Sequence, residues 1–314
     1  MIAASFERAT TMRRVLFCLV MLGCYGAAAQ STGWPVGPGH TVLTLWPKGA
    51  PGTNTTTGPE ADTSTATSTK TGGRPVVRLG NVSAPTLTVF APKEKNTDAA
   101  VVVFPGGSYK ILAMDLEGTE VCDWLISRGI TCVLLKYRVP DTGPYPKSDE
   151  ALQDAQRAVG MVRAHAAEWK VDPKRVGVLG FSAGAHLATA VSTHYGIRLY
   201  PRVDDADDES CRPDFAVVVY PGYLALAEKN FAFTPDIPVT RQTPPTFLVQ
   251  AEDDPVHVEN AVVYFLALKG AGVPAELHLY AKGGHGYGLR RTQLPVTGWP
   301  DRVDEWLKTI GMVP

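Results

Sequence analysis

The chain has 314 residues and a formal net charge of −1, with 45% hydrophobic and 19% charged residues. This near-neutral balance gives no sign of a nucleic-acid or membrane-surface partner. The length suffices for one large α/β domain with a sizeable core.

The N-terminus has the features of a secretory signal peptide. Two arginines precede the apolar run 15–22, and small residues follow at 27–29. The run is too short to span a bilayer, so residues 1–29 are expected to be a signal cleaved after Ala29, with export to the periplasm or medium. The signal is more regular when read from Met12. An alternative is a lipoprotein box, which would anchor the protein to a membrane through Cys24.

Export would leave three cysteines, Cys122, Cys132 and Cys211. An odd number leaves at least one thiol free. Cys122 falls in an expected helix and Cys132 in an expected strand. We expect buried free thiols, with a disulfide bridge as the alternative.

Residues 30–75 are expected to form an N-terminal extension. Its part from 48 to 75 is rich in Thr, Ser, Gly and Pro and has few residues able to build a core, which indicates a linker or surface loop. Asn54 and Asn81 lie in N-glycosylation sequons.

A regular pattern follows, and residues 76–314 are expected to form one α/β domain. Strands are predicted at 86–90, 99–104, 131–137, 176–179, 215–220, 246–250 and 275–280, and helices at 117–128, 149–169, 185–195, 258–270 and 299–310. This alternation indicates a mostly parallel central sheet with helices on both faces. Ligands of such sheets bind at the carboxyl ends of the strands.

A nucleophile elbow is predicted at 180–184. The residues Gly-Phe-Ser-Ala-Gly stand between an expected strand and an expected helix, with Ser182 at the centre. Side chains two residues before or after the serine would collide with the strand or the helix, and the helix N-terminus favours negative charge in front of it. The alternative is a glycine-rich turn that only packs tightly.

A serine hydroxyl needs a general base, and the base needs an orienting acid. The expected chain order is Ser, then Asp or Glu, then His. His285, in the glycine-rich stretch 283–288, is the predicted base, with His257 as the alternative. Asp254 is the preferred acid because its spacing after the preceding strand fits best, and Asp253 is the second choice.

The oxyanion of an acyl-transfer intermediate needs hydrogen-bond donors. The turn 104–109 follows a buried strand, and its two glycines allow backbone amides to approach a ligand. Gly107, Ser108 and Ala183 are the predicted oxyanion residues, and the alternative is a bare strand-to-loop turn.

Three aromatic residues could offer stacking surfaces to a sugar, although core packing is the favoured interpretation of each. They are Tyr109, Tyr287 and Trp299.

The acidic insertion 203–209 is expected to be a solvated loop. It lacks the spaced oxygen ligands and the central glycine of a calcium-binding loop.

Several motifs, in order, resemble the esterase/lipase group of the α/β-hydrolase fold, and most of all exported bacterial carbohydrate esterases of the acetylxylan and feruloyl type. They are FPGGSY at 104–109, LKYRVP at 135–140, DAQRAV at 154–159, DPKRVGVLGFSAGAHLA at 172–188, RPDFAVVVYPG at 212–222, AEDDPVHVEN at 251–260 and GGHGYGL at 283–289. The resemblance spans roughly 85–310, so 76–314 would be the catalytic domain.

The resemblance implies that Ser182, Asp254 and His285 are nucleophile, acid and base. It places the oxyanion loop at 106–108, where the related pattern is three glycines, often preceded by His, and this chain has Pro105 and Ser108. No large lid insertion is visible between the strands, which suggests an open site for short acyl groups. No metal or cofactor is implied.

The expected function is therefore the removal of short acyl groups, acetyl above all, from a carbohydrate such as xylan, with no nucleic acid as partner. Alternatives are a feruloyl or general short-chain carboxylesterase and a serine peptidase of the prolyl-oligopeptidase kind, for which the chain has no room for a propeller. A non-catalytic binding module is a third alternative, against which the full set of Ser, Asp and His argues.

Overall fold

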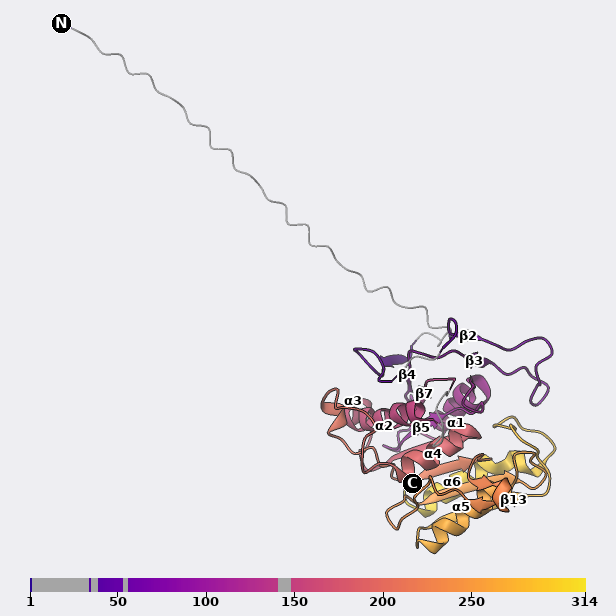
Figure 1. Ribbon diagram of the computed structural model, residues 1–314. Helices are drawn as coiled ribbons and strands as arrows, with labels where there is room; N and C mark the ends of the chain where they lie inside the picture. The colour runs from indigo at the N-terminus through magenta and orange to yellow at the C-terminus, as the bar shows by residue number, and fades with distance from the viewer. Residues whose placement is uncertain (2–33, 35–38, 53–55, 141–147) are drawn as a thin grey trace. The chain divides into compact units, whose positions relative to one another are not determined.

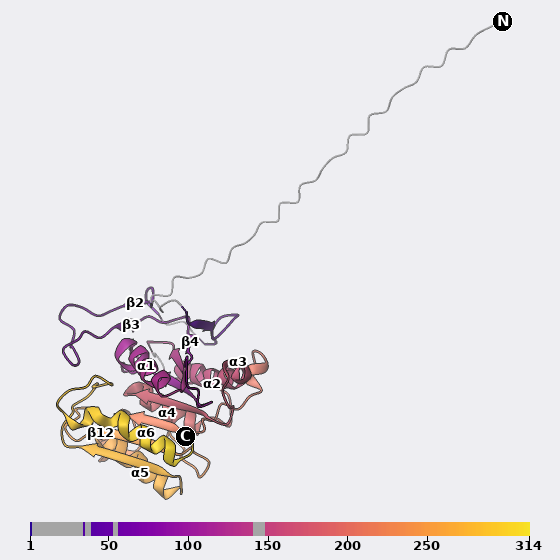
Figure 2. The ribbon, with the colours of Figure 1, turned by 180° about the vertical axis from the view of Figure 1, so that it is seen from behind.

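An eight-stranded sheet forms the centre of the fold, with helices around it (Figures 1 and 2). Its order is β1-β4-β7-β5-β8-β9-β12-β13. β4 is antiparallel to β1 and β7, and the strands from β7 to β13 run parallel. The strands are β1 (Thr41–Thr44), β4 (Thr86–Phe90), β5 (Ala100–Phe104), β7 (Thr131–Lys136), β8 (Val176–Phe181), β9 (Ala216–Val219), β12 (Thr246–Ala251) and β13 (Ala275–Tyr280).

This computed structural model describes Met1, Trp34 and residues 39–52, 56–140 and 148–314. The predicted signal peptide with Cys24, apart from Met1, and the sequon residue Asn54 lie outside these residues. Within the described part of the chain, no helix has the length and apolar character needed to cross a membrane.

The helices form layers on the sheet. α2 packs against α4, and α1 meets α6 where the rings of Trp124 and Trp299 lie 5.9 Å apart. The helices are α1 (Glu120–Ser127), α2 (Asp149–Ala164), α3 (Ala166–Trp169), α4 (Ala183–Thr193), α5 (Glu259–Gly270) and α6 (Trp299–Thr309), and a π-helical turn, η1 (Asp115–Thr119), precedes α1. Short 3₁₀ turns are η2 (Asp205–Asp207), η3 (Ala227–Lys229) and η4 (Pro295–Gly298).

The central strands are apolar because both of their faces are covered. Every residue of β5, with the sequence AVVVF, is buried, as is every residue of β8, β9 and β12. Continuous apolar runs are typical of parallel strands between two helical layers. The fold thus confirms the expected mostly parallel sheet.

The predicted domain boundary at residue 75/76 does not separate two structural units. β1, from the expected extension, is the edge strand of the main sheet, and residues 32–314 form one compact unit. Leu45 and Trp46, directly after β1, are buried in the main core at 0% and 4% exposure. The described residues of the extension that form β1 and its continuation to Trp46 therefore belong to the same packed unit as the rest of the fold.

Two small sheets lie outside the central one. β2 (Ala61–Asp62), β3 (Arg78–Gly80) and β6 (Ile111–Ala113) form one, and β10 (Ala225–Leu226) and β11 (Ala232–Phe233) form the other.

The preference for free thiols at Cys122 and Cys132 is wrong. A disulfide joins them, with their Cα atoms 5.1 Å apart, and it links α1 to β7. Helix α1 packs directly on β7, which brings the two cysteines within the range that a disulfide requires. Cys211 is buried and free.

The acidic insertion 203–209 carries η2 and is attached to the core by the buried guanidinium of Arg157. This group pairs with Asp204 at 2.6 Å and with Asp207 at 3.1 Å. Among the described residues, no group of three or more His, Cys, Asp or Glu side chains could hold a metal ion. These carboxylates serve ion pairs, as does Asp208 with Arg202.

Candidate active site

Ser182 lies at the sharp turn between β8 and α4, with φ 52° and ψ −117°. A side chain at Gly180 would place Cβ 2.0 Å from the carbonyl oxygen of Gly184, and one at Gly184 would place Cβ 2.1 Å from that of Phe104. Such approaches exclude any other residue type without movement of the backbone. This is the predicted elbow, which presents the serine at the carboxyl end of the strand.

His285 bridges Ser182 and Asp254. Its Nε2 lies 2.8 Å from Ser182 Oγ, and its Nδ1 lies 2.8 Å from Asp254 Oδ2. Asp254 also accepts bonds from the amide of Val256 at 2.7 Å and from Gln250 Nε2 at 3.0 Å. The Asp254 carboxylate can only accept hydrogen bonds, so the Nδ1 of His285 carries the hydrogen that it donates to Asp254. The unprotonated Nε2 is then available to accept the serine proton.

The side chains of Asp253 and Asp254 have different hydrogen-bond partners. The side chain of Asp254 is fully buried behind His285, whereas Asp253 Oδ1 accepts the amides of Gly283 and Gly284, each at 2.8 Å. These bonds, led by that from Gly284, lower the pKa of Asp253. The preference for Asp254 agrees with this geometry. Asp253 instead holds the loop that carries His285.

The predicted oxyanion loop lies beside the serine. A Cβ on Gly106 would lie 2.9 Å from Ser182 Cβ. The backbone is left-handed at Ser108, with φ 56°, and Gly107 has φ 137°. Among the residues that the structure describes, the amides of Gly107, Ser108 and Ala183 have no hydrogen-bond acceptor, whereas that of Gly106 donates to Glu117. These three amides remain the candidate donors for an oxyanion.

The carbonyl groups of this loop are directed to other partners. Those of Pro105, Gly106 and Gly107 accept bonds from the Tyr137 hydroxyl, the Ala113 amide, and the amides of Lys110 and Ile111.

The three aromatic candidates for sugar stacking are core residues. Trp299 is 0% exposed, and its indole donates to the carbonyl of Gly288 at 2.8 Å. Tyr109 is 2% exposed and bonds His186 Nδ1 at 2.7 Å through its hydroxyl. Tyr287 is 5% exposed and lies against the ring of Tyr220. Substrate stacking is therefore a wrong expectation for Trp299, and packing describes all three, because aromatic rings contribute large apolar areas to a core.

The other histidines do not reach Ser182 through any hydrogen bond among the described residues. His186 is buried and bonds Tyr109. His257, the alternative base, lies in the same pocket as Ser182 and packs against Phe231 with ring centroids 5.2 Å apart.

A pocket of about 480 Å³ opens at Ser182 and His285. Residues of the β10–β11 hairpin and of the segments before β10 and α5 line it, including Leu226, Tyr223 and Val256. Ser108 contributes from the oxyanion loop. The pocket therefore lies at the carboxyl ends of β8, β9 and β12, where ligands of parallel sheets bind.

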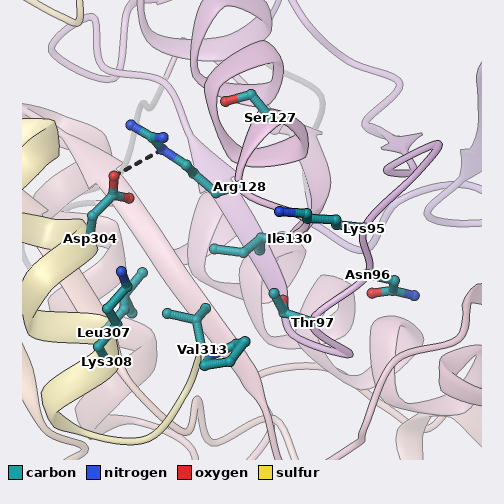
Figure 3. Close-up of a pocket in the computed structure, with 11 residues that line it drawn as sticks. Lys95, Asn96, Thr97, Ser127, Arg128, Ile130, Asp304, Leu307, Lys308 and Val313 are labelled. Carbon is teal, nitrogen blue, oxygen red and sulfur yellow. Dashed lines mark ion pairs between the residues drawn. The ribbon is translucent and has the colours of Figure 1, made fainter.

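A second hollow, of about 500 Å³, lies away from this site (Figure 3). Thr97 and Ile130, which line it, precede β5 and β7, so it lies at the amino ends of the parallel strands. Arg128 and Asp304 form an ion pair of 2.9 Å in its wall. None of Ser182, Asp254 and His285 lines it.

Two residues that sequence reasoning did not single out contact the loops around Ser182. Glu117 is 4% exposed and accepts the amide of Gly106, and Tyr220 places its ring 4.9 Å from that of His285. The only indication of them in the sequence is their position, since Glu117 begins an expected helix and Tyr220 ends an expected strand.

The chain is similar to several known proteins. A family model described as BD-FAE matches residues 87–220. The acetylxylan esterase of Xylanibacter ruminicola is 30% identical over 217 residues, which are 65% of this chain and 44% of that protein. The endo-1,4-beta-xylanase B of Butyrivibrio fibrisolvens is 26% identical over 240 residues, 68% of this chain and 36% of that protein. The chain thus spans less than half the length of either curated relative.

A solved structure is similar over nearly its full length. The crystal structure of an acetyl ester-xyloside bifunctional hydrolase from Caldicellulosiruptor lactoaceticus is 33% identical with a TM-score of 0.66, and the match covers 87% of this chain and 97% of that one. MGS-M1, an α/β hydrolase enzyme from a Medee basin deep-sea metagenome library, is 26% identical with a TM-score of 0.59, and the match covers 72% of this chain and 92% of that one.

Proposed function

The chain belongs to the α/β-hydrolase family, with the BD-FAE proteins, and from this premise we propose that it is a serine carboxylic ester hydrolase. The observation that carries the proposal is the bridge of His285 between Ser182 and Asp254, with 2.8 Å on each side. Esterases among the similar proteins support the same chemistry.

In the proposed mechanism, Ser182 Oγ attacks the ester carbonyl and His285 Nε2 takes its proton. Asp254 holds the imidazole in the required tautomer and stabilises the imidazolium. The amides of Gly107, Ser108 and Ala183 stabilise the oxyanion. The imidazolium then protonates the leaving alcohol, and water activated by His285 hydrolyses the acyl-enzyme.

We propose an acetylated carbohydrate such as xylan as the substrate. The names of the acetylxylan esterase and the acetyl ester-xyloside hydrolase among the similar proteins support this class. The pocket at Ser182 is open to solvent beside polar groups of Glu228 and His257, which suits a short acyl group on a hydroxylated alcohol.

We also propose that the protein is exported. The N-terminal pattern of arginines, an apolar run and small residues supports a signal peptide. The disulfide between Cys122 and Cys132 supports an oxidising compartment, since cytosolic thiols are kept reduced.

Acetate release from acetylated xylan tests the function. The wild type should release acetate, and Ser182→Ala should release none above background. If the wild type cleaves p-nitrophenyl acetate but leaves acetylated xylan intact, ester hydrolysis stands and the carbohydrate assignment falls. Release of ferulate from a feruloylated glycan in place of acetate would favour the feruloyl esterase alternative.

A further inference from the structure

A carboxyl group lies buried between the two loops that flank Ser182. Glu117, in η1, has an exposure of 4%. Its Oε2 accepts the amide of Gly106 in the oxyanion loop at 2.7 Å, and its Oε1 accepts the hydroxyl of Tyr220 at 2.8 Å. A buried carboxylate is costly unless its oxygens are bonded, and both bonds of Glu117 go to segments of the site.

Tyr220 extends this connection to the loop that carries His285. Its hydroxyl oxygen accepts the amide of Gly288 at 3.1 Å, three residues beyond the histidine. Its ring packs edge-on against the His285 ring, with centroids 4.9 Å apart. A chain of three hydrogen bonds therefore runs from Gly106 through Glu117 and Tyr220 to Gly288.

The direction of these bonds fits an ionised Glu117. The amide of Gly106 can only donate. Because the amide of Gly288 also donates to the Tyr220 oxygen, the single hydroxyl hydrogen of Tyr220 is free to donate to the carboxylate. Burial raises the pKa of Glu117. The hydrogen bonds from Tyr220 and Gly106 oppose that rise, and the electrostatic interaction with His285 opposes it to a smaller extent.

We propose that Glu117 is a positioning residue, whose carboxylate holds the oxyanion loop and the His285 loop in one fixed relative position. The proposal rests on the proposed ester hydrolysis. A Cβ on Gly106 would lie 2.8 Å from Glu117 Oε2 and 2.9 Å from Ser182 Cβ, so a shift of the carboxylate displaces the backbone directly beside the nucleophile. The negative charge also stabilises the imidazolium that His285 forms during the reaction.

Glu117→Gln is the decisive variant, because it keeps the shape and removes the charge. Its amide oxygen can accept from Gly106 only if its nitrogen faces Tyr220, whose hydroxyl must then change from donor to acceptor. Both bonds also lose the assistance of the carboxylate charge and become weaker. Asp154→Asn is the matched control: Asp154 is also fully buried, but it bonds Trp46 and Arg138 away from the pocket. Tyr220→Phe and the double variant Glu117→Gln with Tyr220→Phe complete a double-mutant cycle.

Activity on p-nitrophenyl acetate is normalised to the concentration of active sites. This concentration is determined by labelling each protein to completion with a fluorophosphonate. Glu117→Gln should lower kcat on the order of 10- to 100-fold with little change in KM, since misplaced groups lose transition-state stabilisation. The acid limb of its kcat/KM profile should move to lower pH, because the imidazolium loses a nearby negative charge. The double variant should lose less than the product of the single losses, and Asp154→Asn should show neither effect.

Hydrogen exchange gives a readout that does not depend on turnover. Exchange should accelerate in segments 104–113 and 284–290 of Glu117→Gln and stay unchanged there in Asp154→Asn. A kcat within about twofold of wild type per labelled site, with an unmoved acid limb, would overturn the proposal, as would unchanged exchange in both segments. A wild type without esterase activity would instead overturn the proposed function.

Discussion

The residues around Ser182 differ in how far the sequence reveals them. Ser182 and His285 lie in glycine-rich motifs, and the spacing after a strand favoured Asp254 over Asp253. Glu117 and Tyr220 belong to no motif. Their partners lie 11 and 68 residues away in the sequence, at Gly106 and Gly288, so only the folded chain shows what they hold.

Replacing the two adjacent acids should separate their roles. Asp254→Asn removes the acceptor that sets the His285 tautomer, so kcat should fall on the order of 10⁴-fold, as in other triads. Asp253→Asn keeps that acceptor and only weakens the bonds to Gly283 and Gly284, so it should lose less than about 10-fold. Steady-state kinetics on p-nitrophenyl acetate compares them. If kcat fell more in Asp253→Asn than in Asp254→Asn, Asp253 would be the acid that orients His285.

The pH dependence of stability should show the burial of Glu117. Burial raises its folded-state pKa, so the folded protein retains a proton that the unfolded chain releases near the ordinary carboxyl pKa of about 4.3. The contribution of this group to the free energy of unfolding is thus full below that pH and lost as pH rises through the raised pKa. In urea unfolding, the free energy of unfolding of the wild type should therefore fall relative to that of Glu117→Gln as pH rises through this window.

Asp253→Asn is a control for which the opposite change of stability with pH is expected. The amides of Gly284 and Gly283 lower the pKa of Asp253, so the wild type should gain stability relative to this variant as pH rises toward the ordinary carboxyl pKa. If both differences change in the same direction, the burial account of Glu117 is wrong.

At the scale of elements, the strongly patterned segments were predictable and the small ones were not. The strands β4 and β13 match their expected bounds, and α5 begins one residue later than expected. β1 was missed because its residues are mostly exposed and its stability comes from pairing with β4. β10 and β11 have two residues each, too few for any periodicity to show.

The elbow should tolerate no side chain at Gly184. Gly184→Ala would bring Cβ within 2.1 Å of the Phe104 carbonyl oxygen, so we expect loss of soluble enzyme or a loss of kcat of at least about 100-fold. Gly196→Ala is the matched control, since its Cβ would meet nothing within 4 Å. Expression yield and kcat are measured together. A Gly184→Ala protein as active as Gly196→Ala would contradict the elbow geometry.

At the scale of the whole molecule, the sequence predicted one α/β unit but neither the strand that the N-terminal segment adds to its sheet nor the disulfide. Helical packing on the sheet brings Cys122 and Cys132 together, and no periodicity encodes that distance. The N-terminal segment from Thr41 joins the main sheet through backbone bonds to β4, which composition does not predict.

The disulfide should stabilise the folded chain. It closes a loop between residues 10 apart, for which chain entropy gives about 2–3 kcal/mol. The double variant Cys122→Ser and Cys132→Ser should therefore have a lower Tm than the wild type, and reductant should lower the Tm of the wild type but not that of the double variant. Cys211→Ser, which removes the buried free thiol, should remain sensitive to reductant. A wild type insensitive to reductant would contradict the bridge.

The nucleophile is the centre of this account, and covalent labelling tests it most directly. The protein is treated with a fluorophosphonate, digested and analysed by mass spectrometry, in parallel with p-nitrophenyl acetate hydrolysis. We predict one adduct, on Ser182, absent from Ser182→Ala, and a fall in kcat of about 10⁴–10⁶-fold in that variant. An adduct on another residue, or near-normal hydrolysis by Ser182→Ala, would contradict the assignment of Ser182 and the mechanism built on it.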